Sequence, residues 1–439
     1  MRLSILGGRV IDPAQNLDQQ LDVHLQDGKI LALGDAPQDF VAEQTLSAEG
    51  LIVSPGFIDL SCHLREPGPS YKGNIASETQ AALAGGFTSV CARPDTQPPL
   101  DNPAVVRVVR EKAEAVGQVR VLPVGALTQN LEGQLLTNLS GLQASGCVAF
   151  SNLRSAIQDN LVLRRCMEYA ATFDLLLIFY PEDASLAAGG CAHEGAMASQ
   201  LGLQGIPETA ETLAVAQNLL LIEQTGIRAH FSHLSSARAL KLVTEARQRG
   251  LPVSADVAAS HLLYTDRQLE DFDSNYHLQP PLRSEADRQA LIRGLSQGEL
   301  QAVSSGHLPH EQAAKMAPFA ASEPGISSLE TLLPQLLSLV EENLLDYTAM
   351  LASLTSGPAA ILGEKLGNLE PGMPADLTLF DPEKTWVLNE QNGYSAGHNT
   401  PCWNRELKGR VMATLVGGEL RYSVPEDPET TKTVETVKA

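Results

Sequence analysis

The side chains with the clearest chemical potential follow one short, mostly apolar stretch near the start of the chain. Residues 51–60 predict a buried strand, and the polar loop after it contains His63 and Arg65. In a parallel α/β barrel, chemistry is carried by residues at such strand ends. A neutral imidazole is a metal ligand, and a guanidinium binds a carboxylate through two parallel hydrogen bonds. These are the residue types that a metal or an acidic substrate would need.

A repeating order of strands and helices surrounds this stretch. Between residues 54 and 365, short apolar runs alternate with helical patterns, which is typical of a parallel barrel. The helical pattern 75–84 has Asn74 as its predicted N-cap and Gly85 with Gly86 as its stop. We therefore predict an α/β fold with a (β/α)8 barrel. Its eight expected strands are 51–60, 88–92, 120–124, 147–150, 175–179, 229–231, 253–256 and 302–304.

Both ends of the chain contain short strand-like runs instead of helices. Residues 1–53 include an Asp-Gly hairpin signal between two such runs, and residues 366–424 have the same character. We predict that these two segments together form a small β-sandwich domain, attached to a barrel of residues 54–365. The polar segment 425–439 is predicted to be a disordered tail.

Composition argues against several kinds of partner and location. The chain has 439 residues, with 31 Lys plus Arg and 52 Asp plus Glu, for a formal net charge of −21. A field of this sign repels nucleic acid and anionic membrane surfaces, so we expect neither as a partner. The six cysteines include no Cys-x-x-Cys pair, and neither a signal-peptide core nor a membrane-spanning apolar run is visible. We expect reduced thiols in a cytoplasmic protein.

Motifs along the chain give a more specific indication. Residues 59–65 read Asp-Leu-Ser-Cys-His-Leu-Arg, and residues 95–103 read Asp-Thr-Gln-Pro-Pro-Leu-Asp-Asn-Pro. They resemble the Asp-x-His-x-His-Leu-Arg and Asn-Thr-x-Pro-x-x-Asp-Asn-Pro motifs of bacterial dihydroorotases, which belong to the amidohydrolase superfamily. Segments 201–207, 275–283 and 324–331 match further landmarks of that family. The resemblance covers nearly the whole chain and implies an amidohydrolase barrel with a small β-sandwich.

The same resemblance implies where metal-binding and catalytic residues should stand, and most of them are replaced. His63 and His233 keep two of the six positions. A catalytic zinc normally has three protein ligands, and the reaction also needs a carboxylate to move the proton. We therefore expect no catalytic residue, no metal and no cofactor. The replaced positions are Ser61, Leu153 and Tyr180, together with Gly306 in place of the aspartate that is both ligand and proton carrier.

The implied substrate-binding positions are mixed. Arg65 matches the family's carboxylate-binding arginine, and His310 is retained. The asparagine that assists the arginine is replaced by Asp95, which would repel an anionic substrate. We expect Arg65 and Asp95 to form a structural ion pair, with residual anion binding as the alternative. Cys62 should point away from the barrel mouth if His63 points into it, because neighbouring side chains alternate along a strand.

These observations predict a dihydroorotase-like pseudoenzyme of the amidohydrolase superfamily. In bacteria with similar proteins, the resemblance implies that such a non-catalytic chain associates with aspartate transcarbamoylase. The chain would then be an assembly subunit in de novo pyrimidine (UMP) biosynthesis. We expect equal numbers of the two chains, with six of each as the candidate assembly. Two alternatives stay open. The chain could be an active cyclic amidohydrolase with a rearranged metal site, or a non-catalytic binding module for a pyrimidine precursor.

Overall fold

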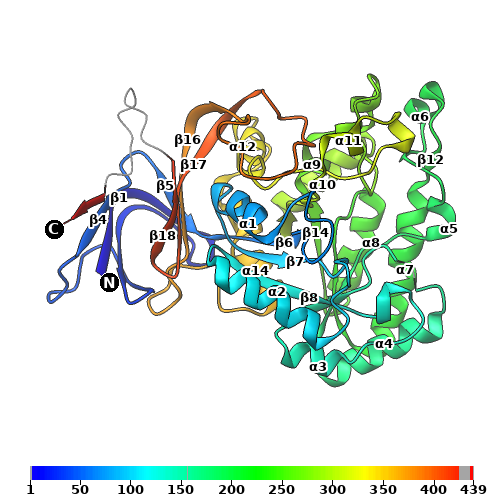
Figure 1. The fold of residues 1–439 in the computed structure, drawn as a ribbon, viewed down its shortest axis with the longest axis horizontal. Coiled ribbons are helices and arrows are strands. Elements are labelled where there is room, and N and C mark those ends of the chain that lie inside the picture. Colours follow the sequence, from blue (N-terminus) through cyan, green and yellow to red (C-terminus); the bar gives the residue numbers. More distant parts are fainter. Residues whose placement is uncertain (1, 156, 425–435, 439) are drawn as a thin grey trace.

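The structure is a computed structural model that describes residues 2–155, 157–424 and 436–438 (Figure 1). A barrel surrounded by helices lies beside a strand-rich part that contains both ends of the described chain. The tail 425–439, predicted to be disordered, lies outside the described residues except for Thr436–Lys438. Those three residues pair with Gln44–Ser47 as an antiparallel strand.

An eight-stranded parallel sheet forms the barrel, as the sequence predicts. Its order in space follows its order in the chain, as expected when each strand is followed by a helical crossover. The first and last strands meet where Cys62 bridges to His307 and the Ser305 amide donates to the Asp59 carboxylate. The strands are β6 (Phe57–Cys62), β7 (Phe87–Ala92), β8 (Arg120–Ala126), β9 (Ala149–Ser151), β10 (Leu176–Phe179), β13 (Arg228–Phe231), β14 (Val253–Ala258) and β15 (Ala302–Ser304).

Helices cover the outside of the barrel (Figure 1). The first one begins and ends where the sequence predicts. The Asn74 side chain accepts from the Ser77 amide, the Ser77 hydroxyl accepts from the Asn74 amide, and Gly85 follows the last helical residue. The helices are α1 (Ile75–Ala84), α2 (Pro103–Val116), α3 (Leu139–Ala144), α4 (Asn160–Thr172), α5 (Ala184–Ala187), α6 (Ala196–Leu201), α7 (Glu208–Thr225), α8 (Ala237–Gln248), α9 (Ala259–Leu263), α10 (Glu285–Ser296), α11 (Gln312–Lys315), α12 (Leu332–Glu341), α13 (Tyr347–Leu354) and α14 (Ser356–Leu362).

The strand-rich part is a mixed sheet of nine strands contributed by both ends of the chain. Strand β5 connects the two halves, because it pairs with β1 on one side and with β16 on the other. A small parallel pair, β11 (Ala192–His193) and β12 (Gly205–Ile206), lies apart from both sheets. The strands of the mixed sheet are β1 (Arg2–Asp12), β2 (Leu17–Gln26), β3 (Lys29–Leu33), β4 (Gln44–Ser47), β5 (Ile52–Pro55), β16 (Leu377–Val387), β17 (Glu406–Val416), β18 (Glu419–Ser423) and β19 (Thr436–Lys438).

The prediction of one continuous strand over 51–60 is wrong. The segment forms two strands, β5 in the mixed sheet and β6 in the barrel, and Gly56 separates them. A Cβ atom at Gly56 would lie 2.2 Å from the Thr88 side chain, so only glycine allows this close approach. The Gly56 amide also donates to the Asp376 carbonyl, which anchors the crossing point to the mixed sheet.

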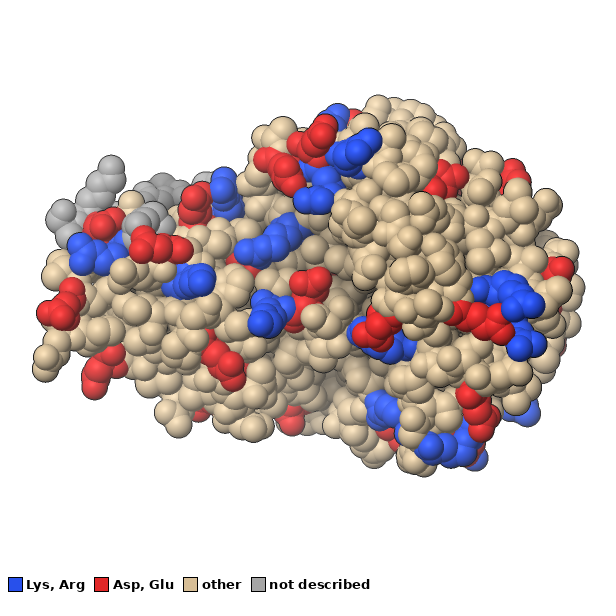
Figure 2. Space-filling model, turned by 90° about the horizontal axis from the view of Figure 1, so that it is seen from below, with Lys and Arg blue, Asp and Glu red and all other residues tan. Residues whose placement is uncertain are grey.

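Two surface properties of the described chain bear on its partners. On the face seen in Figure 2, acidic and basic side chains lie interspersed over both parts of the molecule. The excess of negative charge is therefore not gathered into one patch on this face. Among the described residues, no helix has both the length and the apolar character needed to cross a membrane.

Candidate site at the barrel mouth

The carboxyl ends of the barrel strands bring most of the predicted site positions together. Leu153, Tyr180, His233 and Gly306 line one small cavity of about 80 Å³. Ser61 reaches the same place, because its hydroxyl accepts a hydrogen bond from the Tyr180 hydroxyl. We call this space the mouth cavity. Its position agrees with the rule that barrel sites lie at the carboxyl ends of the strands.

Two of the replaced positions bind each other. The Tyr180 hydroxyl lies 2.9 Å from the Ser61 oxygen, and both groups are buried. Burial raises the pKa of the Tyr180 phenol, which therefore stays neutral and acts as the donor. The Tyr180 and His233 rings pack edge to face at a centroid distance of 5.0 Å. The space where the resemblance places two histidines is thus filled by a hydroxyl pair and an aromatic contact.

His63 is held within the protein rather than presented to the cavity. Its Nδ1 accepts from the Arg65 amide at 2.9 Å, and its Nε2 lies 3.6 Å from Asp95 Oδ1. Burial lowers the pKa of His63 to about 3, so the imidazole is neutral near pH 7. The two ring nitrogens therefore face atoms of the loops that follow β6 and β7.

The expected ion pair between Arg65 and Asp95 is wrong. Asp95 instead pairs with Arg93, whose Nε and Nη2 lie 3.2 and 2.8 Å from the two carboxylate oxygens. Burial acts to raise the pKa of Asp95, but the Arg93 guanidinium outweighs it and holds that pKa at about 2. Both residues belong to the loop that follows strand β7 (Phe87–Ala92).

Arg65 and His310 lie together on the other side of the mouth. Arg65 Nε donates to the Pro309 carbonyl at 2.9 Å, and its Nη2 lies 3.2 Å from His310 Nε2. The Lys72 ammonium lies 3.1 Å from His310 Nδ1 and also pairs with Glu323 at 2.7 Å. Burial, together with Arg65 and Lys72, lowers the pKa of His310 to about 3. Arg65 Nε and both ring nitrogens of His310 therefore have contacts within the chain.

His233 has a different environment from His63. Its backbone has a φ of +58° and its amide donates to the Asp256 carboxylate at 2.8 Å. Its buried Nε2 has no hydrogen-bond partner among the described residues. Burial lowers the pKa of His233 to about 3. Beside it, a Cβ atom on Gly306 would lie 3.4 Å from His233 Cε1, which is ordinary van der Waals contact.

The donor set at the mouth does not fit a metal ion. Among the described residues, no group of three or more His, Cys, Asp or Glu side chains is placed to hold one. Cys62 packs in the cluster between the barrel and the helices, as its expected outward direction requires, and Cys91 packs in the barrel interior. Burial raises the pKa of both thiols, which keeps them protonated.

Two cations of the mouth were not singled out by the sequence reasoning. Arg93 and Arg154 follow β7 and β9, and both line the mouth cavity. Arg154 Nη1 lies 3.3 Å from Glu182 Oε2, and its guanidinium carbon lies 5.8 Å from the Tyr180 ring centroid. Arg93 directly follows the predicted strand 88–92 and Arg154 lies four residues after the predicted strand 147–150, and this position near a strand end is the signal that could have identified them.

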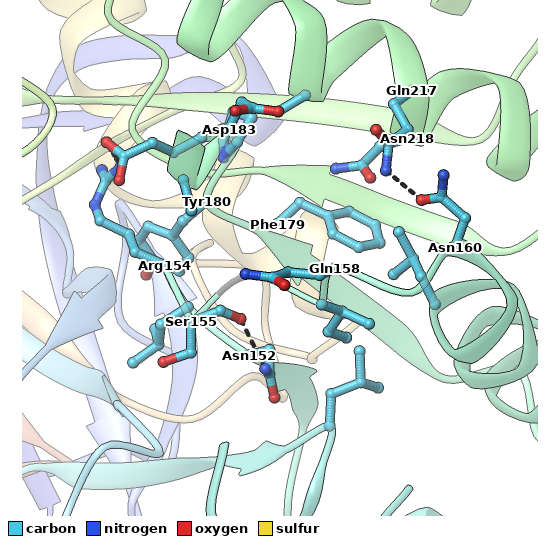
Figure 3. A pocket seen from close by; sticks show the side chains of 18 of the residues that line it. Asn152, Arg154, Ser155, Gln158, Asn160, Phe179, Tyr180, Asp183, Gln217 and Asn218 are labelled. Atoms are coloured by element: carbon cyan, nitrogen blue, oxygen red, sulfur yellow. Dashed lines mark hydrogen bonds and ion pairs between the residues drawn. The ribbon is translucent and has the colours of Figure 1, made fainter. Parts of the chain in front are cut away.

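A larger pocket of about 370 Å³ adjoins the mouth cavity between the loops after β9 and β10 and helix α7 (Figure 3). Leu153, Arg154 and Tyr180 line both spaces and so form the wall between them. Amide side chains of this pocket bind each other or nearby backbone, as in the Gln217 to Asn160 hydrogen bond of 2.6 Å. The pocket therefore has a polar lining whose amides are partly satisfied within the protein.

Comparisons with known proteins point to one family. A family described as "Dihydro-orotase-like" matches residues 50–239. A dihydroorotase-like protein of Pseudomonas aeruginosa is 53% identical over 422 residues, which are 96% of this chain and 100% of that protein. A dihydroorotase of Syntrophus aciditrophicus is 41% identical over 426 residues, covering 96% and 99% of the two chains. The solved L-hydantoinase of Arthrobacter aurescens has a TM-score of 0.85 over 95% of both chains at 22% identity, a likeness of fold.

Proposed function

Because the chain belongs to the dihydroorotase-like family, we propose that it is a non-catalytic member that serves as a structural subunit of aspartate transcarbamoylase. The Tyr180–Ser61 hydrogen bond carries the first half of this proposal. It joins two positions at which the family motifs have metal-binding histidines. Each hydroxyl is buried and already has a partner, so the pair offers little to a metal ion.

The chemistry of the family supports the same interpretation. Opening or closing a cyclic amide needs an activated water, a polarised carbonyl and a carboxylate that carries the proton. Leu153 and Gly306 stand at the two carboxylate positions, and neither side chain can take up a proton. Substrate binding is also impaired, because Asp95 is ionised beside Arg93 at the position of a neutral amide. Nucleophile, proton carrier and substrate contact are thus altered together.

The rest of the barrel keeps its order, which supports a structural role. Glu211 and Arg283, both buried, lie 3.6 Å apart, and the Ser235 hydroxyl contacts both side chains. Glu78 binds the His307 ring at 2.8 Å and the Ser395 hydroxyl at 2.7 Å, which ties α1 to the segment that returns to the mixed sheet. A chain that keeps such buried polar networks but lacks the catalytic residues still has a well-defined fold. Its surface is therefore also well defined and can be recognised by a partner.

The identity of the partner comes from the family relationship. In the active relatives, dihydroorotase and transcarbamoylase catalyse consecutive steps and often associate. A docking surface can therefore be kept after the catalytic activity has been lost. The transcarbamoylase is commonly a trimer, and closed assemblies follow point-group symmetry, so we expect six copies of each chain. A stable contact should bury more than ~1,000 Å² and should lie away from the mouth.

Sedimentation of an equimolar mixture of the two proteins tests this proposal. We expect one species heavier than either protein alone at micromolar concentration, together with a change in transcarbamoylase activity. The variant Arg154→Gln is the matched control, because it alters the mouth cavity without touching the outer surface and should sediment with the partner like the unmodified chain. Separate sedimentation and unchanged transcarbamoylase activity would refute the structural role and leave the ligand-binding alternative.

Metal content gives an independent prediction. After expression in zinc-supplemented medium, the purified chain should contain well below one zinc per molecule, because only His63 and His233 remain of the family's ligands and a stable catalytic site normally has three. Elemental analysis after dialysis measures this. About one tightly held zinc per chain would contradict the assignment and favour an active enzyme with a rearranged site.

A further inference from the structure

The mouth cavity has an unusual lining for a chain with a net charge of −21. Its lining includes two arginines, Arg93 and Arg154, and two histidines, His233 and His261, but among the described residues no aspartate or glutamate lines it. The carboxylates that pair with the arginines, Asp95 and Glu182, lie outside the lining. The lining therefore presents two guanidinium groups, each paired with a carboxylate outside it, and no acidic side chain among the described residues.

Two polar atoms of this lining are buried without a hydrogen bond. Arg154 uses Nη1 for Glu182, whereas its Nη2 has no partner among the described residues. The Nε2 of His233 also has no hydrogen-bond partner among the described residues, and His233 is only 6% exposed. A buried polar atom left without a hydrogen bond is unfavourable, and more so when it is charged, so two such atoms on one small cavity need an explanation.

We propose that the mouth cavity binds a small oxyanion, a carboxylate or phosphate group, between Arg154 Nη2 and His233 Nε2. Arg154 supplies a charged N–H donor. His233 supplies a neutral N–H when its ring proton is on Nε2. The positively charged guanidinium of Arg93 lines the same cavity. Charge-assisted hydrogen bonds of this kind are roughly twice as strong as neutral ones.

The size and the lining of the space agree with this ligand. A cavity of about 80 Å³ is well above the ~10–15 Å³ that a single water requires, so a group of four or five heavy atoms has room. Gly306 lines this space, and no side chain extends from it toward His233, whose Cε1 would lie 3.4 Å from a Cβ atom at that position. Arg65 is not among the residues that line this cavity, and its Nε is bound to the Pro309 carbonyl. The site therefore differs in position from the family's substrate-carboxylate contact.

This inference does not depend on the proposed structural role. A protein that never binds the transcarbamoylase can still bind an anion here, and a structural subunit could have an empty cavity. The role of His233 rests on geometry, because its Nε2 is buried without a hydrogen-bond partner among the described residues and the residue lines the cavity.

Calorimetric titration of the full chain with inorganic phosphate, and separately with acetate, in a phosphate-free and carboxylate-free buffer tests the proposal. We expect saturable binding of at least one of the two, and the tighter one identifies the source of the oxyanion. The variant Arg154→Gln should weaken binding about tenfold or more, because it removes a charge-assisted hydrogen bond. The exposed Arg238→Gln removes the same charge from the surface of α8 and should bind like the unmodified chain.

The variant His233→Asn gives a second arm. Asparagine tolerates the positive φ of +58° better than most residues, so the fold should persist, whereas Nε2 is lost and binding should weaken. Crystals soaked in selenate locate the anion directly. Anomalous density within hydrogen-bond distance of Arg154 and His233 supports the proposal. Anomalous density that lies only on the protein surface would overturn it. Equal weakening of anion binding by Arg154→Gln and Arg238→Gln would do the same.

Discussion

The purified chain will neither open dihydroorotate nor close carbamoyl aspartate, and the Gly306→Asp variant will be equally inactive. The variant restores the group that the family uses as ligand and proton carrier. A carboxylate without a metal-bound water has no nucleophile to activate, however, and groups that act as a unit give little when only one is restored. Ser61, Leu153 and Tyr180 still stand at the remaining positions.

The Gly306→Asp experiment is informative because the variant should fold. The φ of Gly306 is +61°, a conformation that aspartate tolerates better than most residues, and its Cβ would meet only ordinary contacts at 3.4 and 3.5 Å. Unfolding monitored by circular dichroism checks this. The quadruple reversion Ser61→His, Leu153→Asp, Tyr180→His and Gly306→Asp is the comparison, since it alone restores a full donor set. Steady turnover by the unmodified protein, constant through successive purification steps, would show that the assignment is mistaken.

Local sequence signals were sufficient to predict the ends of helix α1 and the strands of the barrel. Asn74 and Gly85 bound helix α1 at the predicted residues because capping depends on side chains within one turn of the helix. The barrel strands were identifiable because apolar runs alternate with helical patterns. The break at Gly56 was not identifiable, because it depends on the approach of Thr88 from the neighbouring strand. A glycine that separates two strands resembles one within a strand until the contact is known.

The candidate site likewise has features that the sequence predicts and others that depend on contacts in the folded chain. Motif spacing identified Ser61 and Tyr180 as replaced positions, but no local signal shows that residues 119 positions apart bind each other. The partner of Asp95 was wrongly predicted, because Arg65 and Arg93 are both near and only the direction of the loop decides between them. The unpaired Nη2 of Arg154 is a property of packing and has no counterpart in the sequence.

A second large effect is expected beneath the mouth, at Asp256 on β14. This carboxylate is fully buried and accepts four hydrogen bonds of 2.8–3.0 Å, which join β13, β14 and β15. Replacement by alanine should lower the free energy of unfolding by about 3–5 kcal/mol, because it leaves several buried donors without their acceptor. The donors left without an acceptor are His230 Nε2, Ser232 Oγ, Ser304 Oγ and the His233 amide.

The variant Asp256→Asn separates the hydrogen bonds from the charge. Its amide oxygen can still accept from the His233 amide and the Ser304 hydroxyl, and His230 can change tautomer so that Nε2 accepts from the new amide group. The loss should therefore be smaller, about 1–2 kcal/mol. Urea titration of the three proteins measures the order. Equal stability of the alanine variant and the unmodified chain would show that this network does not stabilise the barrel.

The pH dependence of the same comparison shows whether the charge itself contributes. Burial acts to raise the pKa of Asp256, but hydrogen bonding from His230 and the neighbouring donors outweighs it, so the pKa lies below its ordinary value. A carboxyl with a lowered pKa in the folded state stabilises above its unfolded value of about 3.9, and this contribution is lost as the pH falls further. The stability gap between the unmodified chain and Asp256→Asn should therefore be full near pH 7 and should narrow below about pH 4. A difference in free energy of unfolding that stays constant with pH would contradict a contribution from the charge. It would mean that the shape and hydrogen bonding of Asp256 stabilise the barrel at this position.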